Sequence, residues 1–295
     1  MTNWADPAPV GDHRLTLPDG RTVGYAVYGD PGGTTVLNCH GGLVSGHDLA
    51  PADADARALG LRVVSPDRPG VGRTDRLPGY GLRPWVHADV VPLPDHLGAG
   101  QVAVTGWSEG GQFALAVAHE LAPRVTRCAV VAGCLPLDGA AARAELNRLD
   151  RTLTGLAHRA PLAVRGWFAL TGVLARRAPG ALVRGAIRDL PPDEREAVRA
   201  QGPWLATILG EGARQPWGGV DEYRVISAPW GFRPEEVTVP VRLFQGGADR
   251  LVPPAWAAEL ARRIPGAELE PYPDGGHFIA LTRRREILGY LAGLR

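Results

Sequence analysis

Short apolar runs alternate with longer amphipathic segments along the first half of the chain. The apolar runs are typical of strands buried on both faces, whereas the amphipathic segments, with apolar residues at helical spacing, predict helices. Alternation of strands and helices predicts crossover units and a mostly parallel sheet. The expected strands are TVLNCH, LRVVSPD, QVAVTGW and CAVVAG, and the expected helices are 48–59, 84–97 and 112–121.

A hairpin is predicted before this alternation and a helical insertion after it. The turn Pro18-Asp19-Gly20 separates two strand-like runs, 15–17 and 22–28. From 136 to 236 the chain holds amphipathic pieces broken by Gly and Pro. The elements expected after this insertion are the strand VTVPVRLFQGG, a helix at 254–263, the strand AELEPYP and a closing helix at 278–291. We therefore interpret 1–135 and 237–295 as one split α/β domain and 136–236 as a helical insertion.

One predicted helix contains a local conflict. The segment 84–97 carries Pro92 and Pro94. Each proline removes a backbone donor and clashes with the preceding turn of a helix. We expect a kink or an early stop there.

Composition and charge exclude several classes of partner. The 295 residues are 45% hydrophobic and 21% charged, with a formal net charge of +1. This balance gives no electrostatic reason to propose nucleic acid or an anionic membrane as a partner. The start of the chain has no basic region followed by an apolar run, and no stretch reaches the ~18 apolar residues of a membrane span. We expect a cytoplasmic, soluble monomer or homodimer that binds a small molecule.

The three cysteines, Cys39, Cys128 and Cys134, lie in or beside apolar strand-like runs. We expect buried free thiols. If Cys128 and Cys134 share one extended strand, they are about 20 Å apart, beyond the ~7 Å limit for bridging Cα atoms.

Candidate chemistry begins at Ser108, which stands between Gly106 and Gly110 where a predicted strand gives way to a predicted helix. So tight a turn forces its central residue into an unfavourable backbone conformation, and the glycines avoid collisions of a Cβ with the turn. The bend lifts the serine to the carboxyl edge of the sheet, beside the N-terminus of the following helix. We therefore interpret Ser108 as a nucleophile.

The pentapeptide 106–110, Gly-Trp-Ser-Glu-Gly, resembles the nucleophile elbow of the α/β-hydrolase fold superfamily, and the resemblance covers nearly the whole chain. It implies an eight-stranded, mostly parallel sheet flanked by helices, with a helical cap inserted at 136–236. The motif Cys39-His40-Gly41-Gly42 is similar to the family's His-Gly-x loop. The resemblance implies an oxyanion hole made by the backbone N–H groups of Gly42 and Glu109, with His40 orienting the loop.

A second loop, 67–75, is similar to the family's D-x-x-G-x-G-x-S turn, with Thr74 in place of the serine. Its glycines do not follow either phosphate-binding pattern. We expect a structural role for this loop.

The base and the acid of a triad are expected after the last two strands. A serine hydroxyl needs a base near neutral pH, and the imidazole needs a carboxylate to fix its tautomer. Asp249 and His277 follow predicted strands, are 28 residues apart and give the order Ser, Asp, His that this fold uses. Asp138 is the alternative acid, and Asp274 is expected to be a turn residue. The other histidines are expected on the surface or with satisfied hydrogen bonds: His13, His47, His87, His96, His119 and His158.

Glu109 departs from the family's usual small or apolar residue after the nucleophile. Its carboxylate would raise the basicity of His277 or disfavour anionic substrates; alternatively, it is tied up with a neighbouring arginine or solvent, and only the N–H of Glu109 has a role.

The insertion is expected to cover the crevice above the carboxyl ends of the strands, where ligands bind in such sheets. Its aromatic residues either line the substrate pocket or form the core between cap and sheet. The candidate pocket residues are Trp107, Leu43, Trp167, Phe168, Trp204 and Trp217.

The function expected from the resemblance is that of a carboxylesterase-like serine hydrolase. It would cleave an uncharged ester, lactone, thioester or amide of a small apolar substrate, and no metal or organic cofactor is implied. Ser108 argues against epoxide hydrolases and dehalogenases of this fold, which need an aspartate. Two alternatives stay open because fold and triad do not determine the reaction: acyl transfer, lyase or cyclase chemistry, and a low-turnover ligand-binding receptor.

Overall fold

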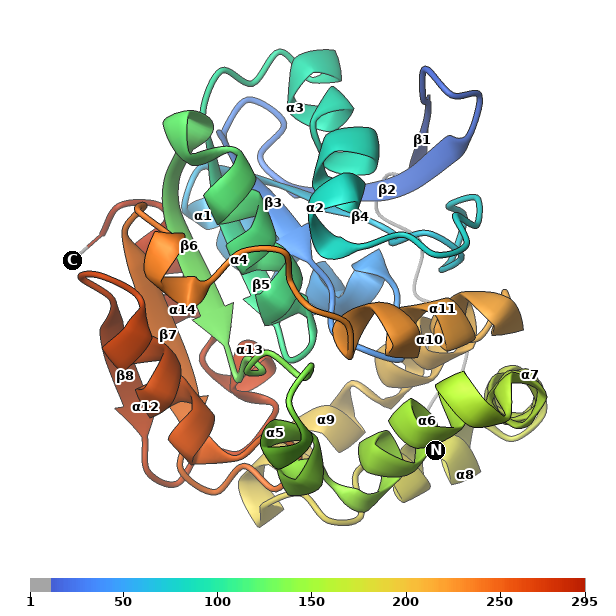
Figure 1. Ribbon diagram of the computed structural model, residues 1–295. Helices are drawn as coiled ribbons and strands as arrows, with labels where there is room; N and C mark the ends of the chain where they lie inside the picture. The colour runs from blue at the N-terminus through green and yellow to red at the C-terminus, as the bar shows by residue number, and fades with distance from the viewer. Residues whose placement is uncertain (1–11, 295) are drawn as a thin grey trace.

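Eight strands form a single twisted sheet in the computed structural model, which describes residues 12–294 (Figure 1). The strand order is β1-β2-β4-β3-β5-β6-β7-β8. β2 pairs antiparallel with β1 and β4, and all the other pairs are parallel. The strands are β1 (Asp12–Thr16), β2 (Thr22–Gly29), β3 (Thr34–Cys39), β4 (Leu61–Pro66), β5 (Val102–Trp107), β6 (Val125–Val131), β7 (Val241–Gly246) and β8 (Glu268–Tyr272). The predicted fold class and the predicted hairpin are confirmed.

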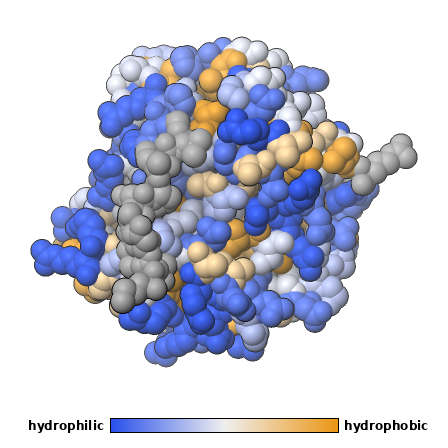
Figure 2. Space-filling model, turned by 180° about the vertical axis from the view of Figure 1, so that it is seen from behind, coloured by the Kyte–Doolittle hydropathy of each residue, from blue (hydrophilic) through white to orange (hydrophobic). Residues whose placement is uncertain are grey.

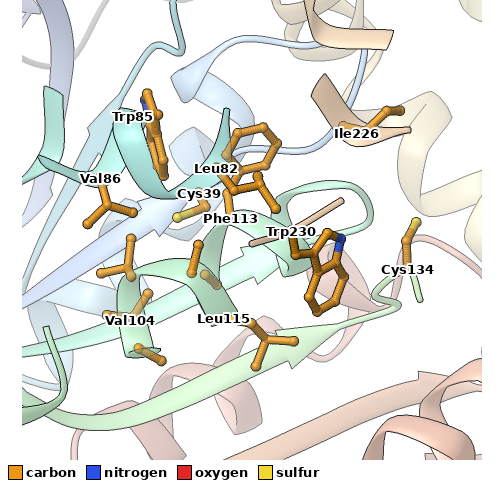
Figure 3. Close-up of a cluster of buried hydrophobic side chains, with 14 of the residues drawn as sticks. Cys39, Leu82, Trp85, Val86, Val104, Phe113, Leu115, Cys134, Ile226 and Trp230 are labelled. Carbon is orange, nitrogen blue, oxygen red and sulfur yellow. The ribbon is translucent and has the colours of Figure 1, made fainter. Parts of the chain in front are cut away.

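Helices cover both faces of the sheet (Figure 1). One face packs against α2 (Leu82–Trp85), α4 (Gly110–Glu120) and α12 (Pro254–Arg263), and the other against α1 (Asp53–Ala58) and α14 (Arg284–Leu291). In the first of these layers, Figure 3 shows Phe113 of α4 close to Trp85, and the two rings meet edge to face with centroids 5.0 Å apart. Such aromatic pairs add to the stabilisation that burial alone provides.

The proline-bearing segment is broken, as its sequence predicts. After α2 the chain forms one π-helical turn, Val86–Val90, and then α3 (Pro92–His96). The N–H of Val91 bonds to the carbonyl of Val86, five residues back. Pro92 has no N–H and starts a new helix, at the position where proline is tolerated.

Two other predicted helices are also interrupted. The segment 48–59 begins as a 3₁₀ helix, Gly46–Ala52, which contains Pro51 and leads into α1. The closing helix is divided at Arg283 into α13 (Ile279–Thr282) and α14. Two further 3₁₀ turns lie at Ala122–Arg124 and Pro234–Glu236.

Seven helices lie between β6 and β7, within the stretch predicted to be an insertion. Figure 1 shows them together at the end of the sheet where the parallel strands terminate. Five of them have proline in the first turn, where its missing N–H has no helical partner to lose. The helices, which we call the helical segment (140–226), are α5 (Ala140–Glu145), α6 (Arg148–Arg159), α7 (Pro161–Arg177), α8 (Pro179–Ala186), α9 (Pro192–Ala200), α10 (Gly202–Gly212) and α11 (Pro216–Ile226).

The three cysteines are buried free thiols, as predicted. Burial raises the pKa of the Cys39 thiol to about 12, which keeps it protonated and unreactive at neutral pH. The face seen in Figure 2 is mostly hydrophilic, with apolar residues in several small groups. Among the helices of residues 12–294, none is both long enough and apolar enough to span a lipid bilayer.

Candidate active site

Ser108 occupies the strained turn that the sequence predicts. Its φ is 57°, in the left-handed region that a residue with a Cβ rarely adopts. A Cβ on Gly106 would overlap the carbonyl oxygen of Gly110, and one on Gly110 would overlap that of Cys39. The serine N–H bonds to the carbonyl of Val131 on β6, at 2.8 Å. The turn is therefore held by its neighbours in a conformation that presents the hydroxyl at the start of α4.

His277 and Asp249 are directly hydrogen-bonded. Nδ1 of His277 lies 2.9 Å from Oδ2 of Asp249. The other carboxylate oxygen accepts the N–H groups of Leu251 and Val252, at 2.8 and 3.0 Å. The carboxylate of Asp249 accepts a hydrogen bond from Nδ1–H of the imidazole. Nε2 is therefore the nitrogen that can accept a proton.

Charges around His277 favour its protonated form. Burial alone would lower the pKa of His277, but the charge and hydrogen bond of Asp249, with Glu194 and Asp150, raise it above its usual value. Burial likewise opposes ionisation of Asp249, yet the charge and hydrogen bond of His277 and the two loop N–H groups hold the pKa of Asp249 below its usual value. The site is thus arranged to stabilise an imidazolium facing a carboxylate.

Ser108 and His277 line the same cavity, which has a volume of about 650 Å³. Trp107 connects the two residues, since its Nε1–H donates to the carbonyl of His277 at 2.9 Å and its ring lies 5.3 Å from the imidazole. The other two acids considered lie elsewhere. Asp138 and Asp274 are both exposed, while Asp249 bonds to the imidazole.

The His-Gly-Gly loop is fixed by a buried hydrogen-bond network. Nε2 of His40 accepts the N–H of Arg68 at 3.1 Å, so Nδ1 carries the proton and donates to the carbonyl of Gly41 at 2.8 Å. Burial, helped by the charge of Arg68, holds the pKa of His40 well below its usual value. The N–H of Gly41 donates to Asp48 at 3.1 Å. His40 therefore orients the loop as a neutral imidazole, and Gly42 faces the cavity.

Arg68 completes this network, a role that the sequence analysis does not predict. Its guanidinium is fully buried and donates to the carbonyl oxygens of His40 and Gly41. It is paired with Glu222 of α11 and lies over the ring of Phe113, 4.4 Å from the centroid. In the sequence it is one arginine of a turn whose expected role is structural.

The turn 67–75 has the structural role that was predicted. Thr74 donates to the carbonyl of Asp67 at 2.7 Å and accepts the N–H of Gly24 at 3.0 Å. The carboxylate of Asp67 accepts the N–H groups of Gly46 and Arg73. These bonds tie the turn to β2 and to the 3₁₀ helix after the His-Gly-Gly loop.

The carboxyl group of Glu109 is buried against the loop opposite. A Cβ on Gly42 would overlap it, and Oε2 has no hydrogen-bond partner within residues 12–294. Burial raises the pKa of Glu109 well above its usual value; the charges of Glu222 and Asp150 add to this, and that of Arg68 opposes it. Arg68 acts on this carboxyl group through its charge, while its guanidinium is hydrogen-bonded to Glu222.

The cavity wall supplied by the helical segment is aliphatic rather than aromatic. Trp107 and Leu43 line the cavity, as predicted. The leucines that line it from the helical segment and from the loops beside its helices are Leu137, Leu146, Leu149, Leu190, Leu205 and Leu209.

Four predicted pocket residues do not line this cavity. Trp167 and Phe168 pack edge to face, with ring centroids 5.0 Å apart. Trp204 donates to the carbonyl of His47 at 2.9 Å, and Trp217 lies beneath the guanidinium of Arg76. Their positions agree with the alternative interpretation, in which such aromatics form the packing between helices and sheet.

Within residues 12–294, no group of three or more His, Cys, Asp or Glu side chains is arranged to hold a metal ion. Besides Ser108, Glu109, Cys134 and His277, a set of charged residues lines the cavity. The charged residues of that set are Arg148, Asp150, Arg188, Asp189 and Arg250.

Comparisons with known proteins agree with this fold. The model of a family described as "alpha/beta hydrolase fold" matches residues 34–283. The pimeloyl-[acyl-carrier protein] methyl ester esterase of Aromatoleum aromaticum is 30% identical over 74% of this chain and 81% of its own. The magnesium-chelatase 30 kDa subunit of Rhodobacter capsulatus is 30% identical over 85% of this chain and 83% of its own. A probable hydrolytic enzyme from Pseudomonas aeruginosa superposes with a TM-score of 0.71 at 20% identity, covering 99% of this chain and 96% of the other.

Proposed function

The chain belongs to the α/β-hydrolase fold family, and from that premise we propose that it is a serine hydrolase that cleaves an uncharged ester, lactone, thioester or amide of a small apolar substrate. One observation carries the proposal. Ser108, in its strained turn, lines the same cavity as His277, whose Nδ1 is hydrogen-bonded to Asp249. The likeness to an esterase supports an ester as the first substrate to test.

The reaction proceeds by acyl transfer to the serine. Ser108 Oγ attacks the substrate carbonyl while Nε2 of His277 takes the hydroxyl proton, and Asp249 stabilises the imidazolium. The oxyanion accepts the N–H groups of Gly42 and Glu109. His277 then protonates the leaving group, and a water activated by His277 attacks the acyl-enzyme. This second attack releases the acid and restores the serine.

The cavity's lining supports an uncharged, apolar substrate. Leucine is the commonest residue of the lining, and a volume of about 650 Å³ suits a small organic molecule. The carboxyl group of Glu109, whose raised pKa favours its neutral form, also lines the cavity, which suits an uncharged acyl group. The helical segment would serve as the cap that shapes this pocket.

The proposal is tested with a fluorophosphonate probe and a panel of p-nitrophenyl esters. We expect covalent labelling of the wild type and ester turnover, and in Ser108→Ala a loss of labelling and a fall in kcat of about 10⁴-fold or more. Ser227→Ala is the matched control, because Ser227 lies outside the cavity lining and bonds to the carbonyl of Tyr223. Absence of labelling overturns the nucleophile assignment. Labelling without turnover of any ester overturns hydrolysis and favours a transferase or a receptor.

A further inference from the structure

Glu194, on the helical segment, bonds to the backbone on both sides of His277. Its Oε1 accepts the N–H of Gly276 at 2.8 Å, and its Oε2 accepts the N–H of Phe278 at 3.1 Å. The side chain is 3% exposed. Burial raises the pKa of Glu194, but the two N–H groups and the charge of His277 oppose this shift and favour the ionised carboxylate.

The local sequence is shaped for this contact. A Cβ on Gly276 would lie 2.5 Å from Oε2 of Glu194 and 2.9 Å from the ring of Pro191. Only glycine lets the two backbones approach so closely. The residues that meet here are more than 80 positions apart in the chain, and they bring the start of α9 against the turn that leads into α13.

The His277 turn is consequently held from three directions. Asp249 binds the imidazole, Trp107 binds the carbonyl of His277, and Glu194 binds the two flanking N–H groups. Of these three, Glu194 alone belongs to the helical segment.

We propose that Glu194 is a positioning residue, through which the helical segment fixes the His277 turn and sets the charge around the imidazole. The inference rests on the proposed function of His277 as the base. It goes further, because the catalytic geometry then depends on contact between the helical segment and the His277 turn. If α9 moves away, this turn loses two hydrogen bonds and a neighbouring negative charge. The charged groups that act on Glu194 are His277 and Asp249, and those that act on His277 are Asp249, Glu194 and Asp150.

Three variants test the proposal. Glu194→Gln keeps the size of the side chain but removes the charge, and its amide nitrogen cannot accept a hydrogen bond. Glu194→Ala removes both bonds. Glu196→Gln is the matched control, because it makes the same chemical change on the exposed face of the same helix.

Ester kinetics distinguish a role of Glu194 in positioning His277 from a role only in holding the helical segment to the sheet domain. In Glu194→Gln we expect kcat for the best ester to fall by about 10- to 100-fold, as misplacement of a catalytic group does, with KM changed less than about threefold. Because His277 must be neutral to accept a proton, loss of the nearby charge lowers its pKa and moves the acid limb of kcat/KM to lower pH by roughly one unit. A variant that melts earlier but keeps the wild-type kcat and acid limb overturns the proposal.

A measurement without substrate distinguishes this failure from failure of the proposed function. The imidazole resonance that disappears in His277→Asn is titrated by NMR in the wild type, Glu194→Gln and Glu196→Gln. We expect a lower titration midpoint in Glu194→Gln only. If that shift occurs in a protein that hydrolyses no ester, the proposed function fails and the link between Glu194 and His277 stands. Identical midpoints in all three proteins overturn the link whatever the activity.

Discussion

Nε of Arg68 lies 2.6 Å from Oε1 of Glu222, although the two residues are 154 positions apart in the chain. Both side chains are buried. The same guanidinium binds the carbonyl oxygens of His40 and Gly41. The pair therefore joins helix α11 to the loop that precedes Gly42. The positive charge of Arg68, balanced by Glu222, lies next to the loop that contributes Gly42 to the proposed oxyanion hole.

Breaking this pair is expected to affect stability and turnover separately. Arg68→Met leaves Glu222 buried without a partner, which costs about 3–5 kcal/mol of unfolding free energy for a buried pair. Arg68→Met with Glu222→Leu removes both charges and recovers most of that loss, because apolar replacements of similar volume are tolerated. The double variant still lacks the bonds to the loop carbonyls, so we expect kcat to stay about 10²-fold below wild type, as for loss of one oxyanion donor.

Denaturant unfolding and ester kinetics on the two single variants and the double variant check this as a double-mutant cycle. The exposed pair Arg262 and Glu259 is the control, and removing it should change the unfolding free energy by less than about 1 kcal/mol. A loss of under 1 kcal/mol in Arg68→Met, or full recovery of kcat in the double variant, would contradict the role assigned to the pair.

The parts of the site that the sequence predicts are those fixed by local geometry. Ser108 is recognisable because glycines stand on either side of it in the sequence, although only Gly106 has a local steric reason, the carbonyl of Gly110, whereas Gly110 is required by the distant carbonyl of Cys39. His277 and Asp249 follow strands, and the carboxyl ends of parallel strands lie at one edge of a sheet, so their meeting could be expected before the structure was known.

The parts that the sequence does not predict depend on how distant elements dock. Glu194 and Glu222 lie on amphipathic helices, where a carboxylate is usually solvated, and their partners are far away in the chain. The orientation of each helix about its axis also decides which residues reach the cavity. Leu205 and Leu209 of α10 line it, whereas Trp204 on the same helix does not. Helical spacing alone does not distinguish these two faces.

Glu109→Gln is expected to make unfolding stability less sensitive to pH. The pKa of Glu109 is raised in the folded protein, so above the ordinary value of about 4.3 the unfolded chain has released a proton that the folded protein keeps. Stability contributed by the protonated carboxyl is thus full below pH ~4 and declines as the pH rises towards the folded pKa. Glutamine mimics the neutral acid and does not titrate.

Unfolding free energies measured from pH 5 to 8.5 check this, with Glu196→Gln as the control. The difference between Glu109→Gln and wild type should grow in favour of the variant as the pH rises, while the control difference stays flat. A flat difference for Glu109→Gln would mean that the folded protein already carries this carboxylate ionised.

The length of acyl chain accepted should be set by α10 and not by the aromatics of α7. Leu209→Trp places a larger side chain in the cavity and leaves less room for a long acyl chain. We therefore expect kcat/KM for long-chain p-nitrophenyl esters to fall, while kcat/KM for the acetate stays at the wild-type value. Each methylene excluded from an apolar wall is worth about 0.8 kcal/mol, or about fourfold in kcat/KM. Trp167→Leu should leave the chain-length profile unchanged, because Trp167 packs on Phe168 outside the cavity lining. An unchanged chain-length profile in Leu209→Trp would mean that the acyl chain does not lie against α10. A shifted profile in Trp167→Leu would mean that the aromatic residues first expected to line the pocket do contact the acyl chain.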